Sequence, residues 1–282
     1  MTIESREICD DRWRRDLEWA VTSPFLVDFP HAHPQLDLSE IELPITRFTG
    51  HRVGYYFESL IAFWLENVRH IDMIAKGHQI IEDGKTLGEL DFVFRDENGT
   101  INHWEVAAKF YLYCADHQFA GSHFIGPNAG DTFERKRDKI FERQLPLSES
   151  HFPEVAVRSA FVKGRIFYHP NQKPPDQLPD SLSENQLRGT WLRQSETAWL
   201  ESLGDTNFRI ARKPFWLAAG GTGYELSLDD LRICLERHFS STSHPILFSA
   251  GGAGGAGGKQ QMIFVVPDSW PNFDAARAHQ SL

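Results

Sequence analysis

Residues 88–94, GELDFVF, and residues 103–112, HWEVAAKFYL, decide the fold of this chain, with the turn sequence ENG at 97–99 between them. Both segments alternate polar and apolar residues with the period of two that is typical of β-strands. A short Asn-Gly turn between two such segments favours a hairpin. We therefore predict adjacent strands at 87–95 and 101–112.

Each predicted strand has an apolar face and a face that carries charged residues. In the second strand Glu105 and Lys109 share the charged face, whereas the other face carries Trp104 and other residues that are mostly apolar. In the first strand Asp91 and Glu89 lie on the face opposite the alternating Leu and Phe residues. Side chains directly opposite in a hairpin lie close together. We therefore expect Asp91 and Glu105 to meet on one face.

The segments on either side of the hairpin predict a mixed α/β fold. Residues 51–69 follow the helical period and include Glu58, and a strand at 73–82 follows, ending in the turn DGK. Asp131 fits an N-cap, with Glu134 three residues on, for a helix to about residue 145 that Pro146 is expected to end. Before this core we predict a helix at 8–22 and an extended arm at 28–48.

The C-terminal half gives weaker signals. We predict a strand at 156–168, a proline-rich loop at 170–180, helices at 183–204 and 227–239, the latter capped by Ser227, and strands at ILFSA and MIFVVP around the Gly/Ala-rich run 250–258. These elements divide the chain into an N-terminal helix and arm at 1–50, a core at 51–168 and an α+β region at 169–282. The sequence leaves open whether that last region completes the same sheet.

Composition limits the class of protein. The 282 residues are 41% hydrophobic, enough for a packed core, and no uncharged apolar run is long enough to span a membrane. The N-terminus lacks the apolar segment of a secretory signal, and the three cysteines show no paired metal spacing, so we expect a cytoplasmic protein. A net charge of −10 argues against a surface that binds duplexes without specificity, but it allows a local basic groove.

The expected meeting of Asp91 and Glu105 has a chemical consequence. Two carboxylates on adjacent strands repel each other unless a cation or a proton lies between them, and oxygen ligands of this kind suit Mg²⁺ or Mn²⁺. Lys109 could steady an attacking water, and Glu58 could supply a third acid. The plainer alternatives are a solvated hairpin face, a surface lysine, and a Glu58 that pairs with Arg52.

This motif order resembles a known superfamily. A helix that carries Glu58, then GELDFVF, a turn and HWEVAAKFYL, is similar to the core of the PD-(D/E)XK nucleases. Across residues 15–145 the chain resembles more closely a bacterial member of that superfamily, the domain of unknown function 1853 family. The matching motifs are WAVTSPFL (19–26), YYFESL (55–60), GELDFVF, HWEVAAKFYL and GPNAGD (126–131).

The resemblance implies a restriction-endonuclease-like core, with a mixed central sheet flanked by helices, and Mg²⁺-dependent hydrolysis of phosphodiester bonds. Asp91 and Glu105 would ligate the metal, Lys109 would orient the attacking water or stabilise developing charge, and Glu58 would bind a second metal or a metal-bound water. The usual pattern places the lysine two residues after the acid, and that position here is Ala107. Lys109 lies on the same face, one pleat further along.

The predicted helix at 132–145 is rich in basic residues. It carries Arg135, Lys136, Arg137, Lys139 and Arg143 against three acidic residues. The resemblance implies that this helix flanks DNA or RNA, with Lys136, Lys139 and Arg143 as candidates for contacting phosphates. The alternative is a solvated face with internal ion pairs. Two further function hypotheses stay open: an inactive nuclease-fold module that binds nucleic acid or a protein, and an enzyme acting on a small phosphorylated molecule.

Overall fold

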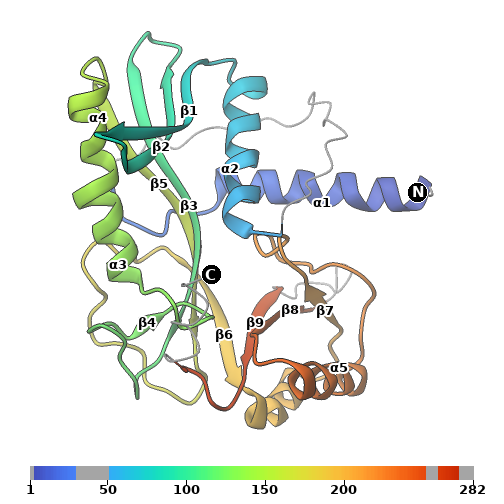
Figure 1. The fold of residues 1–282 in the computed structure, drawn as a ribbon. Helices are drawn as coiled ribbons and strands as arrows, with labels where there is room; N and C mark the ends of the chain where they lie inside the picture. The colour runs from blue at the N-terminus through green and yellow to red at the C-terminus, as the bar shows by residue number, and fades with distance from the viewer. Residues whose placement is uncertain (1–2, 30–50, 252–259, 273–282) are drawn as a thin grey trace. The chain divides into compact units, whose positions relative to one another are not determined.

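The computed structural model describes residues 3–29, 51–251 and 260–272. Most of the predicted arm at 28–48 and of the Gly/Ala-rich run at 250–258 therefore lies outside the described residues. The described chain is a mixed α/β protein, as the sequence predicts (Figure 1).

In the described residues, nine strands form one mixed sheet in the order β1-β2-β3-β5-β6-β9-β8-β7, with β4 paired to β3. Pairs β1/β2, β2/β3, β3/β4, β7/β8 and β8/β9 are antiparallel, whereas β5/β6 and β6/β9 are parallel. The C-terminal strands therefore extend the same sheet. The strands are β1 Asp72–Glu82, β2 Lys85–Arg95, β3 Ile101–Tyr113, β4 Phe124–Ile125, β5 Val157–Tyr168, β6 Leu187–Arg193, β7 Phe208–Ala211, β8 Ile246–Ala250 and β9 Gln261–Val266.

The chain divides into two compact units, each assembled from several segments. Unit 1 comprises residues 1–109, 135–164 and 180–186, and unit 2 comprises residues 110–134, 165–179 and 187–282. Strands β3 and β5 contribute residues to both units. The prediction divided the chain into contiguous regions at residues 50 and 168, whereas each compact unit combines segments that are distant in the sequence.

Helices cover both faces of the unit 1 strands (Figure 1). On one face lie α1 (Ile3–Thr22) and α2 (Val53–Phe63), which continues as the π-helical η1 (Trp64–Val68). There Trp104 stacks on Phe161 with ring centroids 5.0 Å apart, and Trp64 lies beside both rings. These buried aromatic residues come from the apolar faces of the predicted elements. The predicted helices at 8–22 and 51–69 are confirmed.

The helix on the opposite face is longer than predicted. It begins at Phe133 and runs through α3 (Phe133–Asp138), the π-helical η2 (Lys139–Gln144) and α4 (Leu145–His151). The prediction that Pro146 ends it is wrong. Pro146 occupies the first turn of α4, where a missing N–H is tolerated, and the wider π turn before it accommodates the break in regular hydrogen bonding.

The prediction of a single helix at residues 183–204 is also wrong. Residues 183–204 do not form one helix, because residues 187–193 are strand β6, and η3 (Gln194–Leu203) is a 3₁₀ helix. Parallel pairing of β6 with β5 and β9 overrides the local preference, and the buried Trp191 donates from its indole to Tyr113 O at 2.8 Å. The predicted strands β8 and β9 are confirmed, as is α5 (Leu228–Ser241) with its Ser227 cap.

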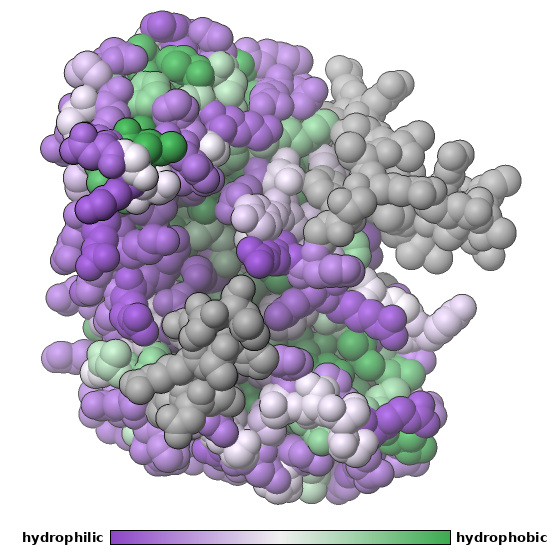
Figure 2. Space-filling view, viewed as in Figure 1, coloured by the Kyte–Doolittle hydropathy of each residue, from purple (hydrophilic) through white to green (hydrophobic). Residues whose placement is uncertain are grey.

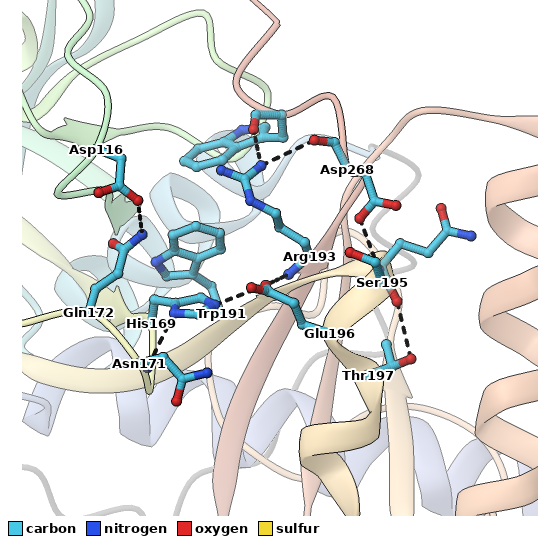
Figure 3. Close-up of polar contacts among 12 residues, drawn as sticks. Asp116, His169, Asn171, Gln172, Trp191, Arg193, Ser195, Glu196, Thr197 and Asp268 are labelled. Atoms are coloured by element: carbon cyan, nitrogen blue, oxygen red, sulfur yellow. Dashed lines mark hydrogen bonds and ion pairs between the residues drawn. The ribbon is translucent and has the colours of Figure 1, made fainter.

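Polar side chains tie together the carboxyl ends of the parallel strands β5, β6 and β9 in unit 2 (Figure 3). His169 Nδ1 accepts from the backbone N–H of Asn171, so Nε2 carries the proton and donates to Glu196 Oε2 at 2.9 Å. Glu196 also accepts from the backbone N–H of Arg193 at 2.7 Å, and Asp268 Oδ1 accepts from that of Ser195 at 2.9 Å. These donors and acceptors satisfy one another, as in a structural network.

Candidate functional site

Three of the four predicted catalytic residues, the acids, lie close together with a lysine that was predicted only as a phosphate contact. All of these residues belong to unit 1. Glu58 lies on α2, Asp91 on β2, Glu105 on β3 and Lys136 on α3. Glu58 interacts electrostatically with Asp91 and Lys136, and Lys136 interacts with Asp91 and Glu105. The predicted proximity of the acids is therefore present in the structure.

The strand register explains why Asp91 and Glu105 meet. Phe92 pairs with Trp104 and Val93 with His103, and the same register carried one residue further sets Asp91 opposite Glu105. Asp91 Oδ2 accepts from the backbone N–H of Val106 at 2.7 Å, and the Glu105 carboxylate is close enough to raise the pKa of Asp91. Two carboxylates at this distance repel each other unless a proton or a cation lies between them.

Burial raises the pKa of each acid, and like charge raises it further at Asp91 and Glu58. Burial, followed by the charge of Glu105, raises the pKa of Asp91 from 3.8 to about 7. Burial raises the pKa of Glu105 from 4.5 to about 7, against the opposing effect of Lys136. Burial, followed by the charges of Asp91 and Glu89, raises the pKa of Glu58 to about 7. With pKa values near 7, these three acids are partly protonated at neutral pH, and a divalent cation can displace their protons.

The lysine that interacts directly with both carboxylates is Lys136, and Lys109 lies close to Lys136. Burial, followed by the charges of Lys109 and Lys139, lowers the pKa of Lys136, whereas Asp91 and Glu105 raise it. Lys109 thus belongs to the same electrostatic cluster through Lys136. The sequence had indicated Lys136 only as a phosphate contact on a basic helix. Its place among the acids depends on how that helix packs on β3, which no local pattern reveals.

Two uncharged side chains hold Glu105, and the sequence did not single out either for this role. Glu105 is 1% exposed, and its Oε1 lies 3.0 Å from His103 Nε2, while Gln144 Nε2 donates to its Oε2. Burial, followed by the charge of Arg158, lowers the pKa of His103 to about 4, although Asp91 opposes this. His103 is therefore neutral at physiological pH. The one available signal was its position two residues before Glu105, on the same face of β3.

The other predicted basic residues lie on the outer side of the helix. Lys139 and Arg143 are exposed, and Lys139 is close enough to lower the pKa of Glu105. Figure 2 shows a largely hydrophilic surface over α3 and α4. Arg137 forms an ion pair with Asp138 at 2.6 Å. Part of this helix therefore has the internal ion pairs expected of a solvated helix face.

The donor set suits a hard divalent cation with few protein ligands. In the described ranges, no cluster of three or more His, Cys, Asp or Glu side chains is arranged to hold a metal ion. Asp91 and Glu105 supply two carboxylates, and Mg²⁺ is commonly held by one or two carboxylates with its remaining positions taken by water and substrate phosphates. The residues present therefore fit Mg²⁺ or Mn²⁺ if water and substrate phosphates supply the remaining ligands.

A family model described as Domain of unknown function (DUF1853) matches residues 15–266. The chain belongs to this family. The match includes the C-terminal half, where the sequence motifs gave no independent support. No curated protein and no solved structure gives a significant match. Among the helices that the structure describes, none is both long enough and apolar enough to cross a membrane.

Proposed function

We propose that this DUF1853 chain is a Mg²⁺- or Mn²⁺-dependent nuclease that hydrolyses phosphodiester bonds in DNA or RNA, with a PD-(D/E)XK-like core in unit 1. The observation that carries the proposal is the juxtaposition of the half-buried Asp91 and the buried Glu105 with the lysines 109, 136 and 139. Carboxylates suit a metal ion and lysines suit phosphate oxygens, so the cluster offers partners for both components of the reaction.

The order of elements supports the same proposal. An α-helix carrying Glu58 precedes the antiparallel strands β1, β2 and β3, and the basic helix that begins at Phe133 follows. This order agrees with the motif resemblance on which the nuclease-like core rests. The resemblance supports a fold as well as a site, although a fold alone does not determine an activity.

Each residue has a proposed role in the reaction. Asp91 and Glu105 would hold the metal ion, and Glu58 would accept a hydrogen bond from a metal-bound water or assist a second ion. Bound Mg²⁺ lowers the pKa of a coordinated water and offsets phosphate charge. Lys136 is well placed to donate to a phosphoryl oxygen, because it already lies beside both carboxylates. Lys109 and Lys139 add positive charge next to it, and Arg143 extends the basic surface.

The test is metal-dependent cleavage of DNA and RNA by the purified chain. Asp91→Ala and Glu105→Ala should abolish cleavage and leave the circular dichroism spectrum unchanged. Asp72→Ala is the matched control, because Asp72 is an exposed acid on β1 in the same unit. Lys136→Met should lower the cleavage rate by about 100-fold while Mn²⁺ still binds, as expected when a transition-state donor is lost. An Asp91→Ala or Glu105→Ala variant that cleaves as fast as the parent would refute the proposal.

A second candidate is a nuclease-fold module that binds nucleic acid or a protein without hydrolysis. Ala107 at the usual lysine position favours it, as does the net charge of −10, which is unfavourable for binding a long polyanion. Mn²⁺ binding to the parent, without cleavage of any DNA or RNA substrate, would support this candidate over the nuclease.

A further inference from the structure

We propose that Gln144 and His103 are positioning residues that hold the Glu105 carboxylate in the orientation needed for a divalent cation. This inference rests on the proposed function, because it assigns Glu105 as a metal ligand. It extends the site to the helix Phe133–His151, whose side chains would determine how tightly the metal binds.

The two donors approach Glu105 from different elements. His103 Nε2 lies on the same strand, 3.0 Å from Oε1, and Gln144 Nε2 reaches Oε2 from the end of η2. A carboxylate held at both oxygens cannot rotate freely, so its remaining lone pairs keep a fixed direction. Such outer partners commonly orient metal ligands and tune the affinity of the site.

A hydrogen-bonded chain fixes the His103 ring from behind. His103 Nδ1 lies 3.0 Å from Ser148 Oγ, and Ser148 Oγ accepts from Arg158 Nε at 2.9 Å. Because Nε2 faces a carboxylate oxygen, the tautomer that satisfies the pair carries its proton on Nε2 and accepts from Ser148 at Nδ1. His103 is completely buried, so no water competes for these positions.

The π-helical segment explains how one helix can supply several of these groups. Lys136, Gln144 and Ser148 are eight and four residues apart, and Lys136 Nζ donates to Gln144 Oε1 at 3.4 Å. In a regular α-helix, residues eight apart differ by about 80° around the axis. The π turns at Lys139–Gln144 place more residues in each turn, so the three side chains return to the same side of the helix.

The chemistry of the two donors favours positioning over charge neutralisation. Gln144 is uncharged and lies between Lys136 and Glu105, accepting from the ammonium and donating to the carboxylate. An arginine or lysine in its place would neutralise Glu105 and compete with a cation. An amide holds the carboxylate and leaves its charge available.

The experiment is calorimetric titration of Mn²⁺, and separately of Mg²⁺, into the full chain. Gln144→Met removes the donor at similar size and should weaken Mn²⁺ binding about 10-fold. The matched control is Gln172→Met in unit 2, because Gln172 also donates its amide to a carboxylate, that of Asp116 at 3.0 Å (Figure 3). The control should bind Mn²⁺ as the parent does.

Histidine variants test positioning against simple structural support. His103→Leu should lose Mn²⁺ affinity, and His103→Gln, which keeps an N–H donor, should recover most of it. If His103→Leu does not fold, Gln144→Met decides the question, because Gln144 is only partly buried.

Asp91→Asn distinguishes failure of this inference from failure of the proposed function. If Asp91→Asn loses Mn²⁺ binding while Gln144→Met and the folded His103 variants bind as the parent does, the positioning roles are overturned and the metal site stands. If the parent does not bind Mn²⁺ at millimolar concentration, or if Asp91→Asn binds it equally well, both the metal site and the positioning roles are overturned.

Discussion

Replacing Asp91 by asparagine should stabilise the metal-free protein at pH 8. The pKa of Asp91 is raised from 3.8 to about 7 by burial and by Glu105, so the folded state holds a proton that the unfolded chain releases between pH 4 and 7. Stability from this group is therefore fully present below pH 4 and is lost as the pH rises through 7.

The difference in pKa sets the size of this effect. At about 1.4 kcal/mol for each pKa unit, the full loss for Asp91 is about 4 kcal/mol. Asparagine keeps an oxygen to accept from the Val106 N–H, and its amide can donate to Glu105. Because the site is partly open to solvent and can relax, we expect Asp91→Asn to gain about 2 kcal/mol at pH 8 and nothing at pH 4.

Urea unfolding in EDTA, followed by tryptophan fluorescence at pH 4, 6 and 8, measures this gain. Asp72→Asn, at an exposed position on β1, is the control and should not change the pH dependence. An Asp91→Asn variant that is less stable than the parent at pH 8, or a difference that does not vary with pH, would show that the carboxyl pair is not under electrostatic stress.

Two further predictions concern the packing of unit 1. Burial lowers the pKa of Lys163 to about 7, so the unfolded chain binds a proton there that the folded chain lacks between pH 7 and 10. Stability from this group rises with pH over that range by about 5 kcal/mol, at about 1.4 kcal/mol for each pKa unit. Lys163→Met should remove this rise in urea unfolding, and parallel curves for parent and variant would contradict it. A Cβ at Gly164 would lie 1.9 Å from Lys109 O, so Gly164→Ala should destabilise by more than about 3 kcal/mol. Gly84→Ala, with φ of +74° and open space, should cost about 1 kcal/mol by thermal melting, and equal losses at both glycines would refute the close-approach argument.

The sequence alone determined the elements whose signal is local. Alternation fixed the strands β2 and β3, the helical period fixed α2, and the Ser227 cap fixed the start of α5, because each pattern is contained in a few consecutive residues. Alternation also predicted that Asp91 and Glu105 share a face, since the hairpin register follows from the intervening turn. The composition predicted a core large enough to bury these elements.

The tertiary structure alone decided the contacts between distant segments. Residues 187–193 become strand β6 because β5 and β9 pair with them on either side, and neither partner is visible in that segment itself. Lys136 joins the carboxylates, and Gln144 holds Glu105, because a helix with a π-helical segment packs against β3. Local patterns record what each residue prefers, whereas these contacts depend on the burial of whole faces against each other, which exists only in the folded chain.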